Sequence, residues 1–216
     1  MFAGLRAGGF DVCDQAIPMP RPGETLGELA GRIAEQIAAK TTGDFVLGGA
    51  SFGGMLASEM CAMLRPRALL QLGSALTGAA LGSIVRGGAP LVEVVPDEMV
   101  KAPPFRTLAV RFHLGPMRPE IYASCREMFN ATPTAMIRRG LEMILKWEGP
   151  QRIPCPVYRV HGGKDRLVRL MDGPTVIEGT CRTRVVEDAG HLVSMTHEEV
   201  VNRFVKDMLG ELNGSR

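Results

Sequence analysis

Apolar residues follow two spacings along this chain, and each spacing predicts a different element. Mostly apolar runs at residues 45–47 and 68–72 predict strands, and so does the segment at 157–161, which follows Pro154 and Pro156. Residues 10–13 and 183–187 are predicted as the first and last strands. Because helical patterns separate these strands, the sequence predicts an α/β fold, with a mostly parallel sheet covered by helices on both faces.

The helical patterns carry recognisable start signals. Apolar residues three and four positions apart run from Leu26 to Ile37 and again from Val200 to Leu209. Thr25 with Glu28 fits a capping box before the first pattern. Thr196-His197-Glu198-Glu199 fits a second capping box, and Met195 with Val200 is spaced for a hydrophobic staple.

The alternation breaks between residues 75 and 150, where prolines separate helical stretches at 121–129 and 134–147. This break predicts a core of residues 1–74 and 151–216, with a helical cap or lid at 75–150 over one end of the sheet. Met117, Met136 and Trp147 are predicted to bind substrate there, in an apolar pocket with Met99, Phe129 and Met143. The alternative is that these side chains form the core of the insertion itself.

A glycine-rich turn joins the strand at 45–47 to the helix that follows it. Gly49-Ala50-Ser51-Phe52-Gly53 fits the pattern G-x-S-x-G, in which the serine hydroxyl is pushed out of the sheet at a sharp turn. No Lys-Ser/Thr pair follows, as a phosphate-binding loop requires, and Ala50 stands where a dinucleotide fingerprint needs its middle glycine. Ser51 is therefore the predicted nucleophile, and a plain glycine-rich turn is the alternative.

A nucleophilic serine needs a base, and the base needs an orienting acid. His191 lies between the last strand and the last helix, in a loop that opens at the same sheet edge as the serine turn. Asp165 follows the strand at 157–161, at the edge where catalytic residues of parallel sheets collect. Asp188 and Glu187 are rival acids, but their closeness to His191 in sequence makes its ring harder to reach.

The other histidines are expected to have ordinary structural roles. His161 ends a strand and is expected to satisfy local backbone groups, while His197 is expected to be solvated at a helix start. His113 lies in the insertion without a partner motif.

Three motifs in this order resemble the serine-nucleophile branch of the α/β-hydrolase superfamily. They are Gly-Gly-Ala-Ser-Phe-Gly-Gly-Met, Cys-Pro-Val-Tyr-Arg-Val-His-Gly-Gly-Lys-Asp-Arg and Gly-His-Leu-Val-Ser-Met-Thr, and the resemblance runs from about Gly9 to Leu209. It implies a serine hydrolase that cleaves a carboxylic ester or thioester of a small acyl substrate through an acyl-enzyme, without a metal or organic cofactor. The triad would be Ser51, His191 and Asp165, and the Phe52 backbone N–H would stabilise the oxyanion. The alternatives are a carbon–carbon bond hydrolase or lyase on the same scaffold, or a non-catalytic binding protein.

The resemblance also implies strands that this chain does not show. Family members carry further N-terminal strands and a His-Gly turn that supplies a second oxyanion donor, whereas residues 1–7 look like the end of the helix after that turn. We expect a gap in the middle of the sheet, between the strand at 10–13 and the serine strand. Missing upstream residues, a start assigned too late or a rearranged sheet would each account for it. Losing one donor costs about 2.7–4 kcal/mol of transition-state stabilisation, which predicts a slow enzyme.

Composition narrows the remaining possibilities. A chain of 216 residues can bury one substantial core. A net charge of +2 without a basic block gives no indication of nucleic-acid binding. The sequence contains no run of eighteen apolar residues, so a membrane span is not expected. Five scattered cysteines without a CxxC pair argue against a zinc site or a disulfide framework and are consistent with a reducing cytoplasm. The sequence does not indicate an oligomeric state.

Overall fold

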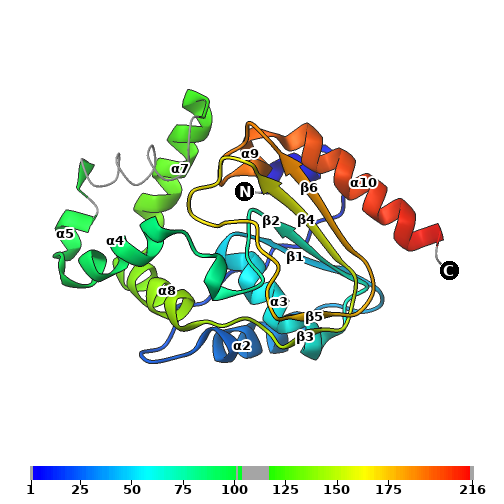
Figure 1. Ribbon diagram of the computed structural model, residues 1–216, viewed down its shortest axis with the longest axis horizontal. Coiled ribbons are helices and arrows are strands. Elements are labelled where there is room, and N and C mark those ends of the chain that lie inside the picture. Colours follow the sequence, from blue (N-terminus) through cyan, green and yellow to red (C-terminus); the bar gives the residue numbers. More distant parts are fainter. Residues whose placement is uncertain (1, 101, 104–116, 215–216) are drawn as a thin grey trace.

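The computed structural model of the protein describes residues 2–100, 102–103 and 117–214 (Figure 1). His113, one of the histidines considered above, lies outside the described residues. None of the described helices is both long and apolar enough to cross a membrane.

The centre of the fold is a parallel sheet of four strands in the order β1-β2-β4-β6. The strands are β1 (Val46–Ala50), β2 (Ala68–Leu72), β4 (Val157–Gly162) and β6 (Cys181–Val186). β2 and β4 are buried at every position, including the polar residues Gln71, Arg159 and His161. A small parallel pair, β3 (Arg152–Ile153) and β5 (Val176–Ile177), lies beside the main sheet.

Helices cover both faces of the sheet, and this confirms the predicted fold class. On one face α2 (Leu26–Ala38) and α3 (Phe52–Leu64) pack against apolar residues of the strands, among them Leu47, Leu69 and Val157. On the other face α1 (Ala3–Ala7) and α10 (Glu198–Gly214) pack against Leu70, Leu72, Tyr158 and Val160. The predicted capping box at the start of α2 is present, with Thr25 and Glu28 bonded in both directions.

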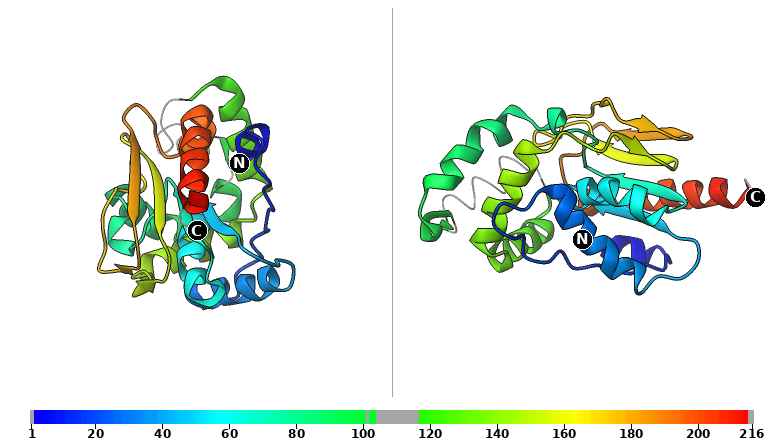
Figure 2. Two further views of the ribbon diagram at one scale, coloured as in Figure 1. Left: turned by 90° about the vertical axis from the view of Figure 1, so that its right-hand side faces the viewer. Right: turned by 90° about the horizontal axis from the view of Figure 1, so that it is seen from below.

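A group of helices lies beyond one end of the sheet, on the side toward which the strand arrows point in Figure 1. It contains α4 (Ser83–Val94), α5 (Asp97–Val100), α7 (Pro119–Ala131) and α8 (Thr134–Lys146), and a short 3₁₀ turn, η1 (Gly78–Ala80), precedes it. The helices predicted at 121–129 and 134–147 are confirmed. Figure 2 shows this group at the opposite end of the molecule from the end of α10.

The strand predicted at residues 10–13 is wrong. This segment is not part of any sheet, and β1 lies at the sheet's edge, so the expected gap in the middle of the sheet is absent. Phe10 instead packs against the core on the α10 side, and the guanidinium of Arg6 bonds to the Val12 carbonyl and to Asp14. A strand is stable only when its backbone groups find a neighbouring strand, and within the described part of the chain no strand pairs with this segment.

The capping box predicted at Thr196 is also wrong. Thr196 is the last residue of the short helix α9 (Val193–Thr196), and its hydroxyl donates to the Leu192 carbonyl rather than capping α10. Met195 and Val200 pack into different apolar clusters, so they do not form the predicted staple. The chain bends at His197 between the two helices, which a local sequence pattern does not reveal.

Candidate active site

Ser51 occupies a strained turn between β1 and α3. Its backbone has φ 51° and ψ −123°, a combination that side-chain-bearing residues rarely adopt and that costs about 1–3 kcal/mol. Hydrogen bonds hold it in place, because its N–H donates to the Leu72 carbonyl at 3.1 Å and the Ser74 hydroxyl donates to its carbonyl at 2.7 Å. The turn therefore presents the Ser51 side chain at the carboxyl end of the sheet, as the G-x-S-x-G pattern predicts.

The structure brings Ser51, His191 and Asp165 together in one chain of hydrogen bonds. Nε2 of His191 lies 2.8 Å from the Ser51 hydroxyl, and Nδ1 of His191 lies 2.8 Å from Oδ2 of Asp165. The Asp165 side chain is fully buried and that of His191 is 4% exposed. Because a carboxylate only accepts, His191 donates from Nδ1 and can accept the serine proton at Nε2.

A tight loop after β4 fixes the Asp165 carboxylate. Its Oδ1 accepts the backbone N–H groups of Leu167 and Val168 at 2.9 and 3.0 Å. Its Oδ2 remains directed at His191. These two backbone donors therefore fix the orientation of the buried carboxylate.

The His191 loop approaches the end of β2 closely at Gly73. A Cβ atom on Gly73 would lie 2.4 Å from the His191 carbonyl oxygen, and Gly73 has a positive φ of 55°. A glycine is therefore required at this position so that the histidine reaches the serine.

Both rival acids, Glu187 and Asp188, are exposed. The carboxylate of Asp188 is 76% exposed and is 3.4 Å from Nε2 of His197, whose hydrogen bond lowers the pKa of Asp188. His197 is thus half-buried and paired instead of simply solvated. His161 bonds to the Val168 carbonyl, as expected of a histidine that satisfies a local backbone group.

The Phe52 backbone N–H occupies the first position of α3. A helical N–H at this position has no acceptor within its own helix, so it can donate to an acceptor beside Ser51. The role of Phe52 as an oxyanion donor stays a prediction.

The predicted substrate-binding residues lie in different surroundings. Met117 packs with Ile121 and Cys125 of α7 against Leu192, the neighbour of His191. Met136, near the start of α8, is half-buried. Of the other pocket candidates, Met99 is exposed and Met143 is part of the main core.

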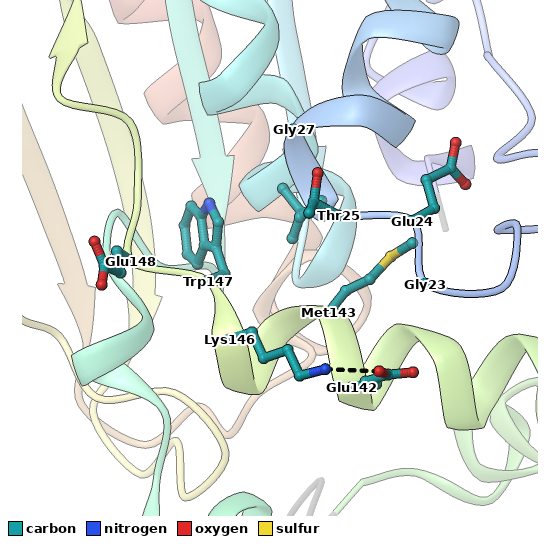
Figure 3. A pocket seen from close by; sticks show the side chains of 10 residues that line it. Gly23, Glu24, Thr25, Gly27, Glu142, Met143, Lys146, Trp147 and Glu148 are labelled. Atoms are coloured by element: carbon teal, nitrogen blue, oxygen red, sulfur yellow. Dashed lines mark hydrogen bonds and ion pairs between the residues drawn. The ribbon is translucent and has the colours of Figure 1, made fainter.

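Trp147 lines a pocket of about 290 Å³ between the start of α2 and the end of α8, shown in Figure 3. Its Nε1 donates to Oε1 of Glu59 at 2.7 Å, which ties the end of α8 to α3. Glu142 and Lys146 form an ion pair at the rim. Because none of the three triad residues lines this pocket, substrate binding by Trp147 stays a prediction.

Two adjacent glycines in the first turn of α3 are expected to respond oppositely to substitution. A Cβ on Gly54 would lie 2.5 Å from the Ser74 hydroxyl oxygen, whereas a Cβ on Gly53 would meet no atom within 4 Å. We expect Gly54→Ala to lower the free energy of unfolding by about 1–3 kcal/mol through overpacking. We expect Gly53→Ala to leave it unchanged or raise it by about 0.5–1 kcal/mol, since alanine favours helix.

Urea unfolding of both variants beside the wild type measures this difference. Equal stability of the two variants would show that Ser74 moves aside without cost.

With the geometry in place, comparison with known proteins is informative. Residues 9–203 match the sequence profile of the alpha/beta hydrolase family. The chain belongs to this family. The motif resemblance is thereby confirmed, although no curated protein matches this alpha/beta hydrolase in sequence.

Solved structures share the hydrolase fold. A thermophilic esterase from Thermogutta terrifontis, with malate bound, aligns with a TM-score of 0.66 and 19% identity over 92% of this chain and 75% of its own. A hydrolase from Pseudomonas aeruginosa PA01 aligns with a TM-score of 0.66 and 20% identity, over 91% of this chain and 75% of its own. A variant of the N-acyl homoserine lactonase AidH, in complex with N-hexanoyl homoserine, aligns with a TM-score of 0.62 and 17% identity, over 87% of this chain and 70% of its own. At these identities the likeness shows the fold.

Some residues that support the hydrolase site were missed by sequence reasoning. Ser74 holds the Ser51 carbonyl, and Leu167 with Val168 supplies the N–H groups around Asp165. Ser74 follows a predicted strand, and its position there is a weak signal. Leu167 and Val168 give no signal, because any residue other than proline carries a backbone N–H.

Proposed function

We propose that this alpha/beta hydrolase is a serine hydrolase that cleaves a carboxylic ester or thioester through an acyl-enzyme. The observation that carries the proposal is the unbroken relay from the Ser51 hydroxyl through His191 to Asp165, with 2.8 Å at each step. A relay with these distances activates a serine without further rearrangement.

The chemistry follows from the relay. Ser51 Oγ attacks the substrate carbonyl while its proton passes to Nε2 of His191, and the negative charge on the carbonyl oxygen meets the Phe52 N–H. His191 then gives this proton to the departing alcohol or thiol as the bond to the carbonyl carbon breaks. A water molecule next loses a proton to His191, attacks the acyl-enzyme and releases the acid, and the proton returns to Ser51. Asp165 stabilises the imidazolium at each stage.

The substrate is proposed to be a small acyl compound, with its apolar part toward α7. Met117 supports this placement, since it packs beside Leu192, directly after the catalytic histidine. An esterase and a lactonase among the solved structures with this fold are consistent with an ester-like substrate.

Labelling with a fluorophosphonate tests the proposal. We expect one covalent adduct per chain, located on the peptide that contains Ser51, because the probe reacts with serines activated by a base. We also expect turnover of p-nitrophenyl acetate. An absence of labelling would favour the non-catalytic alternative, and cleavage of β-diketones without cleavage of esters would favour the carbon–carbon hydrolase.

A further inference from the structure

The Asp165 loop is held by a second buried histidine that the proposed reaction does not use. His161 is the fifth residue of β4, an interior strand of the sheet, and it is 3% exposed. Its Nε2 lies 3.0 Å from the Val168 carbonyl oxygen and 3.6 Å from Oδ2 of Asp165. One ring nitrogen thus faces both the carboxylate and the loop that surrounds it.

The chemistry of these contacts determines the form of the imidazole. A carbonyl oxygen only accepts hydrogen bonds, so Nε2 of His161 carries the proton. Burial lowers the pKa of His161, so the ring is neutral at neutral pH. Arg159 and His191 also lower the pKa of His161, while Asp165 and the bond to the Val168 carbonyl raise it.

The Val168 peptide connects this histidine to the acid. The Val168 N–H donates to Oδ1 of Asp165, and the Val168 carbonyl accepts from Nε2 of His161. Val168 therefore links the histidine to the carboxylate. The same segment bridges to Leu81, through bonds from Gly82 N–H to the Leu167 carbonyl and from Arg169 N–H to the Ala80 carbonyl. These two bonds hold the outer side of the loop, and His161 holds its inner side.

We propose that His161 is a positioning residue, which as a neutral Nε2–H donor fixes the Asp165 loop so that Oδ2 faces His191. The inference rests on the proposed function, since it concerns the acid of the same relay. Neutrality matters, because a charged His161 would compete with the His191 imidazolium for the Asp165 carboxylate.

Two substitutions of His161 by side chains of similar size distinguish the effect of the N–H donor from the effect of side-chain volume. Glutamine places an amide N–H near the position of Nε2, and methionine fills a similar space without a donor. We expect kcat of His161→Met to fall about 10–100-fold with KM changed less than about twofold, and kcat of His161→Gln to stay within about threefold of the wild type. We also expect the acid limb of the pH profile of kcat to move to lower pH in His161→Met alone, because a displaced carboxylate stabilises the imidazolium less.

Ser58→Ala is a matched control for stability. It removes a buried hydroxyl that donates to the Met55 carbonyl at 2.7 Å, away from Asp165, so it should leave the pH profile in place. A folded His161→Met enzyme with unchanged kcat and pH profile would overturn the proposal, as would an equal loss of kcat in His161→Gln.

A measurement on the wild type decides the matter even where a variant does not fold. Imidazole-optimised ¹H–¹⁵N NMR spectra should show His161 as the Nε2–H tautomer at neutral pH, and an Nδ1–H tautomer would contradict the proposal. The two hypotheses fail separately. Full activity of Ser51→Ala removes the proposed function, whereas an inactive Ser51→Ala beside an unaffected His161→Met removes only the role of His161.

Discussion

Ser51→Ala should lower kcat for p-nitrophenyl acetate about 10⁴–10⁶-fold, to near the rate of the buffer. The substitution removes the atom that is proposed to form the acyl bond, and His191 at 2.8 Å then has no hydroxyl to deprotonate. Alanine keeps the backbone contacts of the turn, since those involve the N–H and carbonyl of Ser51. The thermal midpoint should therefore change little while activity is lost.

The control for Ser51→Ala is again Ser58→Ala, seven residues further along the chain and within α3. Its hydroxyl bonds within α3 to the Met55 carbonyl, so its loss should leave kcat unchanged. Purified Ser51→Ala protein that retains full esterase activity would show that another residue is the nucleophile.

Asp165→Asn should lower kcat about 10⁴-fold without unfolding the protein. The amide oxygen can still accept the Leu167 and Val168 N–H groups, so the loop keeps its shape. The amide NH₂ would then face Nδ1 of His191 and favour the tautomer with its proton on Nε2. That tautomer cannot accept the proton of Ser51.

Asp188→Asn separates the two acids that the sequence leaves in competition. Asp188 is mostly exposed and pairs with His197, so its substitution should change kcat by less than about twofold, as is usual for surface positions. Steady-state kinetics on both variants tests the assignment. If Asp188→Asn were the inactive variant and Asp165→Asn the active one, the acid of the relay would have to be reassigned.

The three residues of the relay could be predicted because each lies in a short motif, and because the order of these motifs along the chain indicates which residues meet. The glycines around Ser51 specify a turn within five residues, and Asp165 and His191 each follow a predicted strand. In a parallel sheet the carboxyl ends of all strands meet at one edge, so residues at three such ends are near one another whatever the remaining details. Asp188 also follows a predicted strand, and the sequence favours Asp165 because Asp188 is too close to His191 in the chain to reach its ring easily.

The failed predictions depended on contacts that lie outside the local patterns themselves. Residues 10–13 have an apolar strand-like composition, but strand formation needs a neighbour, and the sheet ends at β1. Thr196 has the spacing of a capping box, yet its hydroxyl bonds backward to Leu192 because α9 intervenes. Patterns of four residues are ambiguous wherever tertiary contacts offer the same polar groups a different partner.

The sequence by itself therefore determined the fold class, the turn at Ser51 and the three residues of the relay, since periodicity, glycine content and chain order act through the local backbone. Only the tertiary structure decided which strands pair, where the sheet ends and how Asp165 is held. The backbone N–H groups of Leu167 and Val168 donate to that carboxylate, and His161 bonds to the Val168 carbonyl. These contacts form only because the loop takes a path that is set by packing against η1 and β4. Backbone donors are the same for nearly every residue type, so their positions are fixed by folding and leave no mark in the sequence.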